Sequence, residues 1–168
     1  MRIPSPDECF EILMKHEVPL AIVHHCELVC DVAVKIADKL VKRGIKVDKD
    51  LVIAAALLHD IGKLKKEPHL RHGGELLRKL GLERIAQVVE RHGLVEFGND
   101  DFIPKTIEEK IVFYADKRAN PGKIVGLEER FDYLKKKYSM SGHVDKEYEF
   151  TKKLEKELLE MIGEDEIC

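Results

Sequence analysis

The sequence predicts an all-α fold, a bundle of about seven to eight helices around one central apolar helix. Runs in which polar and apolar residues alternate are absent, and glycines and prolines mostly fall between segments of helical periodicity. Two Ser/Thr-x-x-Glu sequences, beginning at Ser5 and Thr106, are capping boxes that start helices. The segment Leu51–Leu58 is apolar on all sides, which indicates a helix buried in the centre of the bundle.

Each expected helix has its own start or stop signal. Pro6 occupies the first position of the first helix, Gly44 stops the second, and Asp48 caps the central third helix, which Gly62 terminates. The expected helices span about residues 5–16, 20–43, 48–60, 68–80, 82–91, 106–118, 127–138 and 145–162.

Similar signals separate the later helices. Gly81 divides the fourth from the fifth, a loop is expected over residues 94–103, and Asn120-Pro121-Gly122 breaks the chain after the sixth. The last helix carries an apolar stripe, which indicates a face docked on this domain rather than a partner-binding helix. The stripe consists of Phe150, Leu154, Leu158 and Met161.

Composition and charge exclude several classes of protein. A length of 168 residues suits one domain, and no apolar run approaches the roughly 20 residues that span a bilayer. With 29 basic and 32 acidic residues the net charge is −3, which argues against a generic polyanion-binding surface. Aromatic residues make up only 6% of the chain, and neither aromatic stacking clusters nor a basic stripe supports a nucleic-acid partner. The start of the chain has no secretion signal, so a cytoplasmic location is expected. The scarcity of Asn and Gln beside abundant Lys, Arg and Glu indicates a thermophilic source.

Some of the eight histidines occupy positions from which they could bind one metal ion together. His25 is followed on one helix side by apolar residues, so its side chain should face the core. The dipeptide His59-Asp60 ends the central helix, and Asp116 falls near the end of another apolar helix. A buried ionised Asp needs a partner, and converging helix ends would join two imidazoles to two carboxylates. That mixed set suits Mn, Fe, Co, Ni or Zn better than Ca.

These residues resemble the H…HD…D signature of the HD superfamily of metal-dependent phosphohydrolases. The local contexts agree, with His-Asp-Ile-Gly-Lys over 59–63 and Ala115 before Asp116. The resemblance covers about residues 20–120 and implies an HD-domain helical bundle. We expect a single HD domain over 1–168, with the helices of 127–162 docking on its core. It further implies one or two divalent metals (Mn, Fe, Co, Ni or Zn, with Mg also allowed), held by His25, His59, Asp60 and Asp116.

The resemblance also implies residues for a second metal and for the substrate. Members with two metals add two histidines between the HD pair and the last Asp, and His72 and His92 occupy suitable places, with His69 competing with His72. Asp60 would bridge the metals and help to generate a hydroxide nucleophile. Lys63 would bind phosphate or stabilise the leaving group, and Lys117 and Arg118 would bind substrate. Three histidines are interpreted as surface or structural residues: His16, His24 and His143.

The function expected from this resemblance is hydrolysis of a phosphoester or phosphoanhydride. The substrate would be a nucleotide or a small phosphorylated metabolite, attacked by a metal-activated hydroxide in a monomer or homodimer. Compact diadenosine-tetraphosphate hydrolases share this layout, but the segment after His92 lacks the Thr-Thr-Gly-like stretch expected of them. The alternative is a non-catalytic regulatory module that binds metal and a nucleotide.

Overall fold

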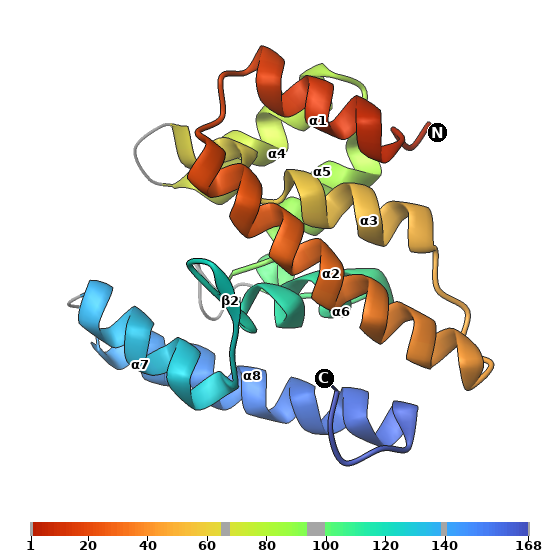
Figure 1. The fold of residues 1–168 in the computed structure, drawn as a ribbon, viewed down its shortest axis with the longest axis vertical. Helices are drawn as coiled ribbons and strands as arrows, with labels where there is room; N and C mark the ends of the chain where they lie inside the picture. The colour runs from red at the N-terminus through yellow and green to blue at the C-terminus, as the bar shows by residue number, and fades with distance from the viewer. Residues whose placement is uncertain (1, 65–67, 94–99, 139–140, 168) are drawn as a thin grey trace.

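The computed structural model describes residues 2–64, 68–93, 100–138 and 141–167, and its elements confirm the all-α fold. The described residues form eight α-helices, two short 3₁₀ helices and one two-stranded sheet (Figure 1). The helices are α1 (Pro6–Lys15), α2 (Leu20–Lys42), α3 (Lys49–Leu58), α4 (His69–Lys79), α5 (Glu83–Glu90), α6 (Ile107–Asp116), α7 (Leu127–Lys137) and α8 (Ser141–Ile162). The 3₁₀ helices are η1 (Ile61–Leu64) and η2 (Asp100–Phe102), and the strands are β1 (Ala119–Asn120) and β2 (Lys123–Ile124).

The helix boundaries follow the local signals in the sequence. Both capping boxes form. The Ser5 and Thr106 side chains accept hydrogen bonds from the backbone N–H groups of Glu8 and Glu109, and the carboxylates of these two glutamates accept hydrogen bonds from the backbone N–H groups of Ser5 and Thr106. Asp48 caps α3 by accepting from the N–H of Leu51. Such bonds satisfy the first N–H groups of a helix, which have no partner within it.

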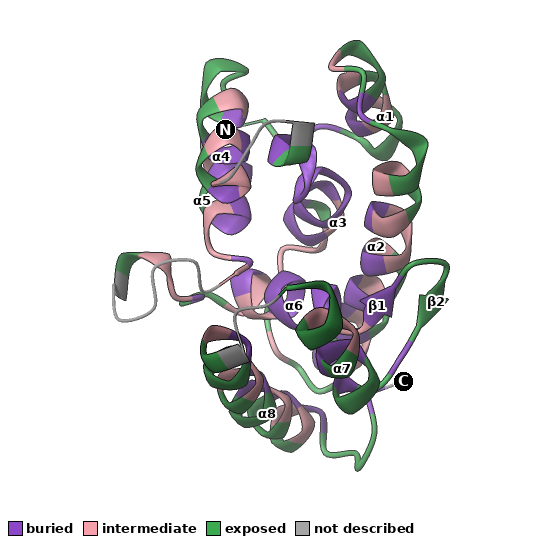
Figure 2. Ribbon diagram, turned by 90° about the vertical axis from the view of Figure 1, so that its left-hand side faces the viewer, coloured by how far each residue is buried: buried purple, intermediate pink, exposed green. Residues whose placement is uncertain are grey.

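The core lies between α2, α3 and α6. α3 packs along α2, and α6 contacts both (Figure 1). Most residues of α3 and α6 are buried, in keeping with the apolar run Leu51–Leu58, and both helices lie inside the bundle (Figure 2). α4 and α5 pack together beside α3 at one end, while α7 and α8 pair at the other end. Polar groups at the ends of α3 and α6 are therefore held inside a rigid apolar frame.

Two features of the C-terminal third differ from expectation. A small antiparallel ladder pairs Ala119 with Ile124 and Asn120 with Lys123 around the Asn-Pro-Gly break, where Gly122 has a φ of +76° that glycine adopts readily. The last helix begins at Ser141, four residues before its expected start at 145. Among the described helices, none has both the length and the apolar character needed to cross a bilayer.

Candidate metal centre

Helix ends bring the predicted histidines and carboxylates together. His25 lies in the second turn of α2, His59 caps the C-terminus of α3, and Asp60 follows it directly. Asp116 is the last residue of α6, and His92 follows the end of α5. Because these helices pack around one core, their ends converge, and the side chains of His59, Asp60, His92 and Asp116 are all buried.

The two carboxylate oxygens of Asp60 face two different pairs of imidazoles. Its Oδ2 lies 3.5 Å from Nε2 of His59 and 3.6 Å from Nε2 of His25. Its Oδ1 lies 3.5 Å from Nε2 of His92 and 3.8 Å from Nε2 of His69. One carboxylate thus adjoins two groups of nitrogen ligands, His25 with His59 and His69 with His92, and each group could hold a cation.

Asp116 completes the first group. Its Oδ1 lies 3.0 Å from Nε2 of His25 and 3.6 Å from Nε2 of His59. The two imidazole nitrogens thus have a carboxylate oxygen of Asp60 and one of Asp116 beside them, and nitrogen and oxygen ligands of this kind are typical of a divalent transition metal.

The ring orientations of the buried imidazoles suit metal binding. Nδ1 of His59 donates to the carbonyl of Ala56 at 2.8 Å, and Nδ1 of His92 donates to the carbonyl of Val89 at 2.6 Å. A hydrogen bond at Nδ1 leaves the lone pair on Nε2, the atom that faces the carboxylates.

Two buried atoms in this cluster lack a hydrogen-bond partner among the described residues. They are Nε2 of His59 and Oδ1 of Asp60. An unsatisfied buried polar atom costs about 1–3 kcal/mol, so such atoms call for a partner that the protein does not supply. A divalent cation fits both, since each is an electron-pair donor, and the chain therefore has a possible His/Asp metal site.

The charges of the cluster are strongly coupled. Burial raises the pKa of Asp60, but His59, His92 and Lys63 outweigh it and hold that pKa well below its usual range. Burial lowers the pKa of His59, but Asp60, Cys26 and Asp116 together outweigh it and hold that pKa well above its ordinary value, so a cation binding at Nε2 would displace a proton. Burial lowers the pKa of His92 to about 4, so this imidazole is neutral near pH 7, as a metal ligand must be.

A cavity of about 400 Å³ opens beside the cluster. Asp60, His69, His92 and Asp116 line its polar side. The opposite wall comes from α4, α7 and α8, through Leu70, Leu134, Tyr138, His143 and Val144. His143, expected to be a surface or structural residue, thus reaches this wall.

Three cations also line the cavity. Nζ of Lys63 donates to Oδ2 of Asp60 at 2.6 Å. The buried Lys117 donates to Oδ2 of Asp116 at 2.6 Å and to the carbonyl of His92 at 3.1 Å, and it pairs with Glu147 of α8 at 3.2 Å. Arg130 of α7 lies 3.7 Å from Oδ1 of Asp116, and its buried Nε has no hydrogen-bond partner among the described residues. No motif in the sequence marked Arg130, because only the packing of α7 brings it here.

Two predicted site residues lie elsewhere. His72 lines a second cavity with His16, while His69, the competing candidate, occupies the place beside His92. Arg118 binds the carbonyl of Val125 and the hydroxyl of Tyr114, so it braces the β1–β2 hairpin and is absent from the cavity lining. Lys65 and Lys66 lie outside the described residues.

Comparison with known proteins gives a family match and several relatives. The family model described as "HD domain" matches residues 22–120. A protein of Picrophilus torridus named tRNA (cytidine(56)-2'-O)-methyltransferase is 35% identical over 97% of this chain and 49% of its own length. A protein of the same name from Thermoplasma volcanium is 33% identical with the same coverage. An uncharacterised protein of Methanocaldococcus jannaschii is 39% identical over 56% of this chain and 64% of its own.

The matches cover only part of the curated relatives, which limits how much of their function can be assigned to this chain. The chain spans about half the length of the two curated methyltransferases it matches. No solved structure matches the chain significantly. The archaeal relatives agree with a prokaryotic, thermophilic source.

The expected enzyme class and partner are wrong on this comparison. A hydrolase of nucleotides or small phosphorylated metabolites was expected, whereas the relatives matching nearly the whole chain are named as transferases that methylate tRNA. The alternative of a regulatory nucleotide-binding module gains no support from them, and the exclusion of nucleic acid as a partner fails. The physical reason is that a set of His and Asp ligands indicates only that a cation can bind, and a cavity with basic residues indicates only that an anion can bind. Neither feature determines which reaction is catalysed. The net charge of the whole chain also does not show whether basic residues are concentrated in one part of the surface, so it could not exclude a nucleic-acid partner.

Proposed function

The chain belongs to the HD domain family, and on that premise we propose that it forms the helical, metal-binding half of a tRNA-modifying protein. The protein would methylate the 2'-oxygen of cytidine 56 in tRNA, in the cytoplasm. The observation that carries the proposal is the match of 97% of this chain to two relatives with that name.

The proposal assigns different tasks to the two halves. In 2'-O-methylation a methyl group leaves the sulfonium sulfur of its donor and bonds to the ribose O2', whose proton passes to a base. The cavity of this chain is lined by Lys63, Lys117 and Arg130, each close to a carboxylate of the same lining, and it offers His and Asp ligands for a metal. The chain spans about half the length of these relatives, so we assign the methyl-donor site to the half that it does not match.

This half would hold a metal and an RNA phosphate. His25, His59, Asp60 and Asp116 would form one metal site, and Asp60 with His69 and His92 a second. We propose Mn, Fe, Co, Ni or Zn as the ion, given the nitrogen and oxygen ligands. A bound ion would supply positive charge for a phosphoryl oxygen. Lys63 and Arg130 would orient the other oxygens, and Lys117 would hold Asp116 and the His92 backbone in place.

Methylation by a chimera tests the proposal. Three proteins are compared. They are the full-length P. torridus relative, a shortened form of it from which the region matched by this chain is removed, and a chimera in which the present chain replaces that region. Tritiated S-adenosylmethionine and an unmodified tRNA transcript report methylation at position 56, and a transcript with uridine at 56 is the control. We expect the shortened protein to lose most of its kcat/KM and the chimera to regain it. Full activity of the shortened protein would overturn the proposal, and methylation by this chain alone would overturn the division of tasks.

A further inference from the structure

The C-terminal end of α7 combines exposed cations with aromatic rings. Its last turn holds Lys135, Lys136 and Lys137, followed by Tyr138, and all four residues are exposed. Nζ of Lys137 lies 5.5 Å from the ring centre of Tyr138 and 5.8 Å from that of Tyr133, one turn earlier. We call the surface formed by Tyr133, Lys136, Lys137 and Tyr138 the α7 rim.

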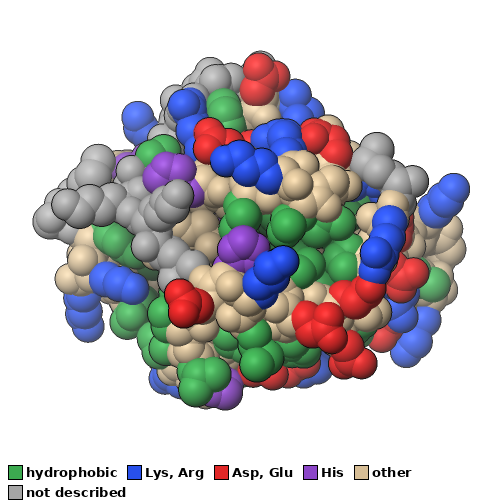
Figure 3. Space-filling view, turned by 90° about the horizontal axis from the view of Figure 1, so that it is seen from above, with side chains coloured by type: hydrophobic (Ala, Val, Ile, Leu, Met, Phe, Trp, Pro, Cys, Tyr) green, Lys and Arg blue, Asp and Glu red, His purple; other side chains and the backbone are tan. Residues whose placement is uncertain are grey.

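The charge of the α7 rim is not neutralised within the described residues. Lys135 pairs with Asp145 at 2.7 Å, whereas Lys136 and Lys137 form no ion pair with any described acid. Other parts of the surface differ: on the face seen in Figure 3, acidic and basic side chains are interspersed. The helix dipole favours lysines at a helix C-terminus, but it gives no reason for an exposed tyrosine among them.

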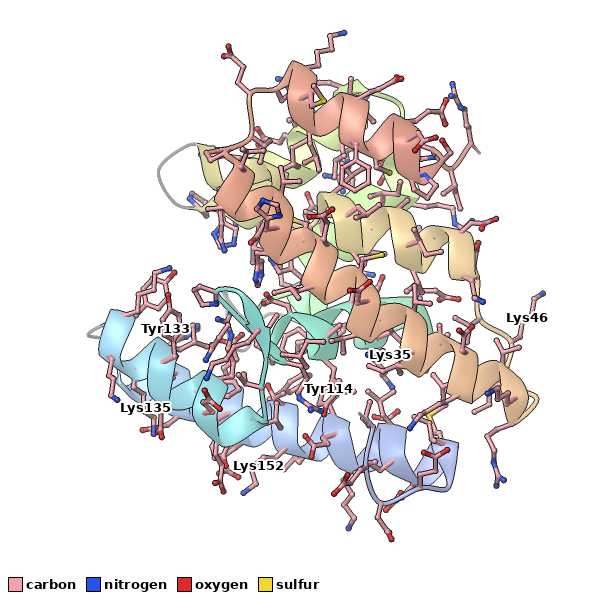
Figure 4. The ribbon with its side chains drawn as sticks, viewed as in Figure 1. Lys35, Lys46, Tyr114, Tyr133, Lys135 and Lys152 are labelled. Atoms are coloured by element: carbon pink, nitrogen blue, oxygen red, sulfur yellow. The ribbon has the colours of Figure 1, made fainter. Side chains whose placement is uncertain are left out.

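The α7 rim adjoins the cavity beside the metal cluster. Tyr138 is 44% exposed and also lines the cavity, together with Leu134 of α7 and Lys63 of η1. Figure 4 shows Tyr133 and Lys135 at this end of α7, with Lys46 at the opposite side of the molecule. An extended polyanion lying on the α7 rim would therefore meet the cavity at Tyr138.

We propose that the α7 rim binds an unpaired segment of tRNA and leads it to the cavity. A base stacks on Tyr138, and the flanking phosphates contact Lys136 and Lys137. Proteins commonly bind single-stranded nucleic acid with aromatic side chains beside basic ones. The aromatic ring stacks on the face of a base, and the basic side chain contacts the negatively charged phosphate that links two nucleotides. The inference rests on the proposed tRNA function and names the surface that carries it. The α7 rim lies outside the region that the HD family model matches, so this surface is an addition to the family core.

Fluorescence anisotropy with a labelled, unmodified tRNA transcript tests the α7 rim in the full chain. We expect Tyr138→Ala to weaken binding about five- to hundredfold, the range for losing one stacked base, and Tyr138→Phe to retain it. The Lys136→Ala/Lys137→Ala variant should weaken binding on the order of tenfold and reduce the salt-dependence slope by about 1.4. Matched controls are Lys46→Ala, far from the α7 rim, and Lys152→Ala, which removes a lysine 5.2 Å from the ring of Tyr148 on α8.

The outcomes separate this inference from the proposed function. Unchanged affinity in the α7 rim variants, with the wild-type chain binding tRNA, overturns the inference and leaves the proposed function standing. Equal losses in the α7 rim and control variants also overturn it, because the effect would then be general electrostatics. A wild-type chain that binds no tRNA overturns it as well, and the chimera's methylation then decides the proposed function separately. Circular dichroism checks that each exposed substitution leaves the helices intact.

Discussion

At the scale of single residues, the position of Asp60 determines what the cluster can bind. Its oxygens face His25 with His59 on one side and His69 with His92 on the other. A carboxylate between two imidazole pairs can coordinate two cations at once, one through each oxygen, whereas a neutral imidazole offers one lone pair. Each of the four histidines is therefore assigned to a site by the Asp60 oxygen that it faces.

This assignment predicts different effects for two histidines only three residues apart. His69→Ala should weaken the second metal site at least about tenfold, because it removes an imidazole facing Oδ1 of Asp60. His72→Ala should leave metal content unchanged, because His72 lines the other cavity. Elemental analysis after desalting, giving metal per chain, checks both variants. Metal loss in His72→Ala but not in His69→Ala would instead favour His72, the residue chosen from the sequence, as the ligand.

At the scale of elements, the contact between η1 and α4 holds residues 59–63, which carry His59 and Asp60, in place. A Cβ atom on Gly62 would come within 2.0 Å of the carbonyl oxygen of His69 and 2.6 Å of the backbone nitrogen of Gly73. Neither backbone atom can move freely, so a side chain here must push α4 away from η1. His69 would move with it.

Gly62→Ala should therefore destabilise the fold by about 1–3 kcal/mol, the usual cost of overpacking. It should also weaken metal binding through the displaced His69. Gly126→Ala is the matched control, since a Cβ atom on Gly126 would have no neighbour within 4 Å and its φ of −75° is ordinary for any residue. Urea unfolding measures both free energies, and equal stability of the two variants would contradict the close approach.

The sequence predicted elements and helix-end positions well where local chemistry determines them. Capping boxes and the apolar run of α3 place His59, Asp60 and Asp116 at helix ends, which is why their proximity could be expected. Choosing between His69 and His72 depends on the helical phase of α4 against η1, which spacing alone does not define. Arg130 depends on the docking of α7 and could not be predicted from any local signal.

At the scale of the whole molecule, the cluster joins parts of the chain that are distant in sequence. Its members come from the starts of α2 and α4 and from the ends of α3, α5 and α6. Lys117 extends this connection to α8 through Glu147, and Arg130 extends it to α7. A cation held at this junction would therefore bind the folded chain and not the unfolded one, in which these ligands are far apart. Its binding free energy then adds to the free energy of unfolding.

This linkage predicts metal-dependent thermal stability that requires His25 but not its neighbour. Manganese, cobalt, nickel or zinc at 100 times the Kd should stabilise the fold by about 2.7 kcal/mol, and EDTA should reverse the shift in Tm. His25→Ala should abolish most of that shift, because His25 contacts both Asp60 and Asp116. His24→Ala should retain it, because His24 points to the exposed Glu27. Thermal melts of the three proteins with and without metal make the comparison. An equal shift in both variants would place the stabilising ion outside this cluster, because only His25 faces the two carboxylates.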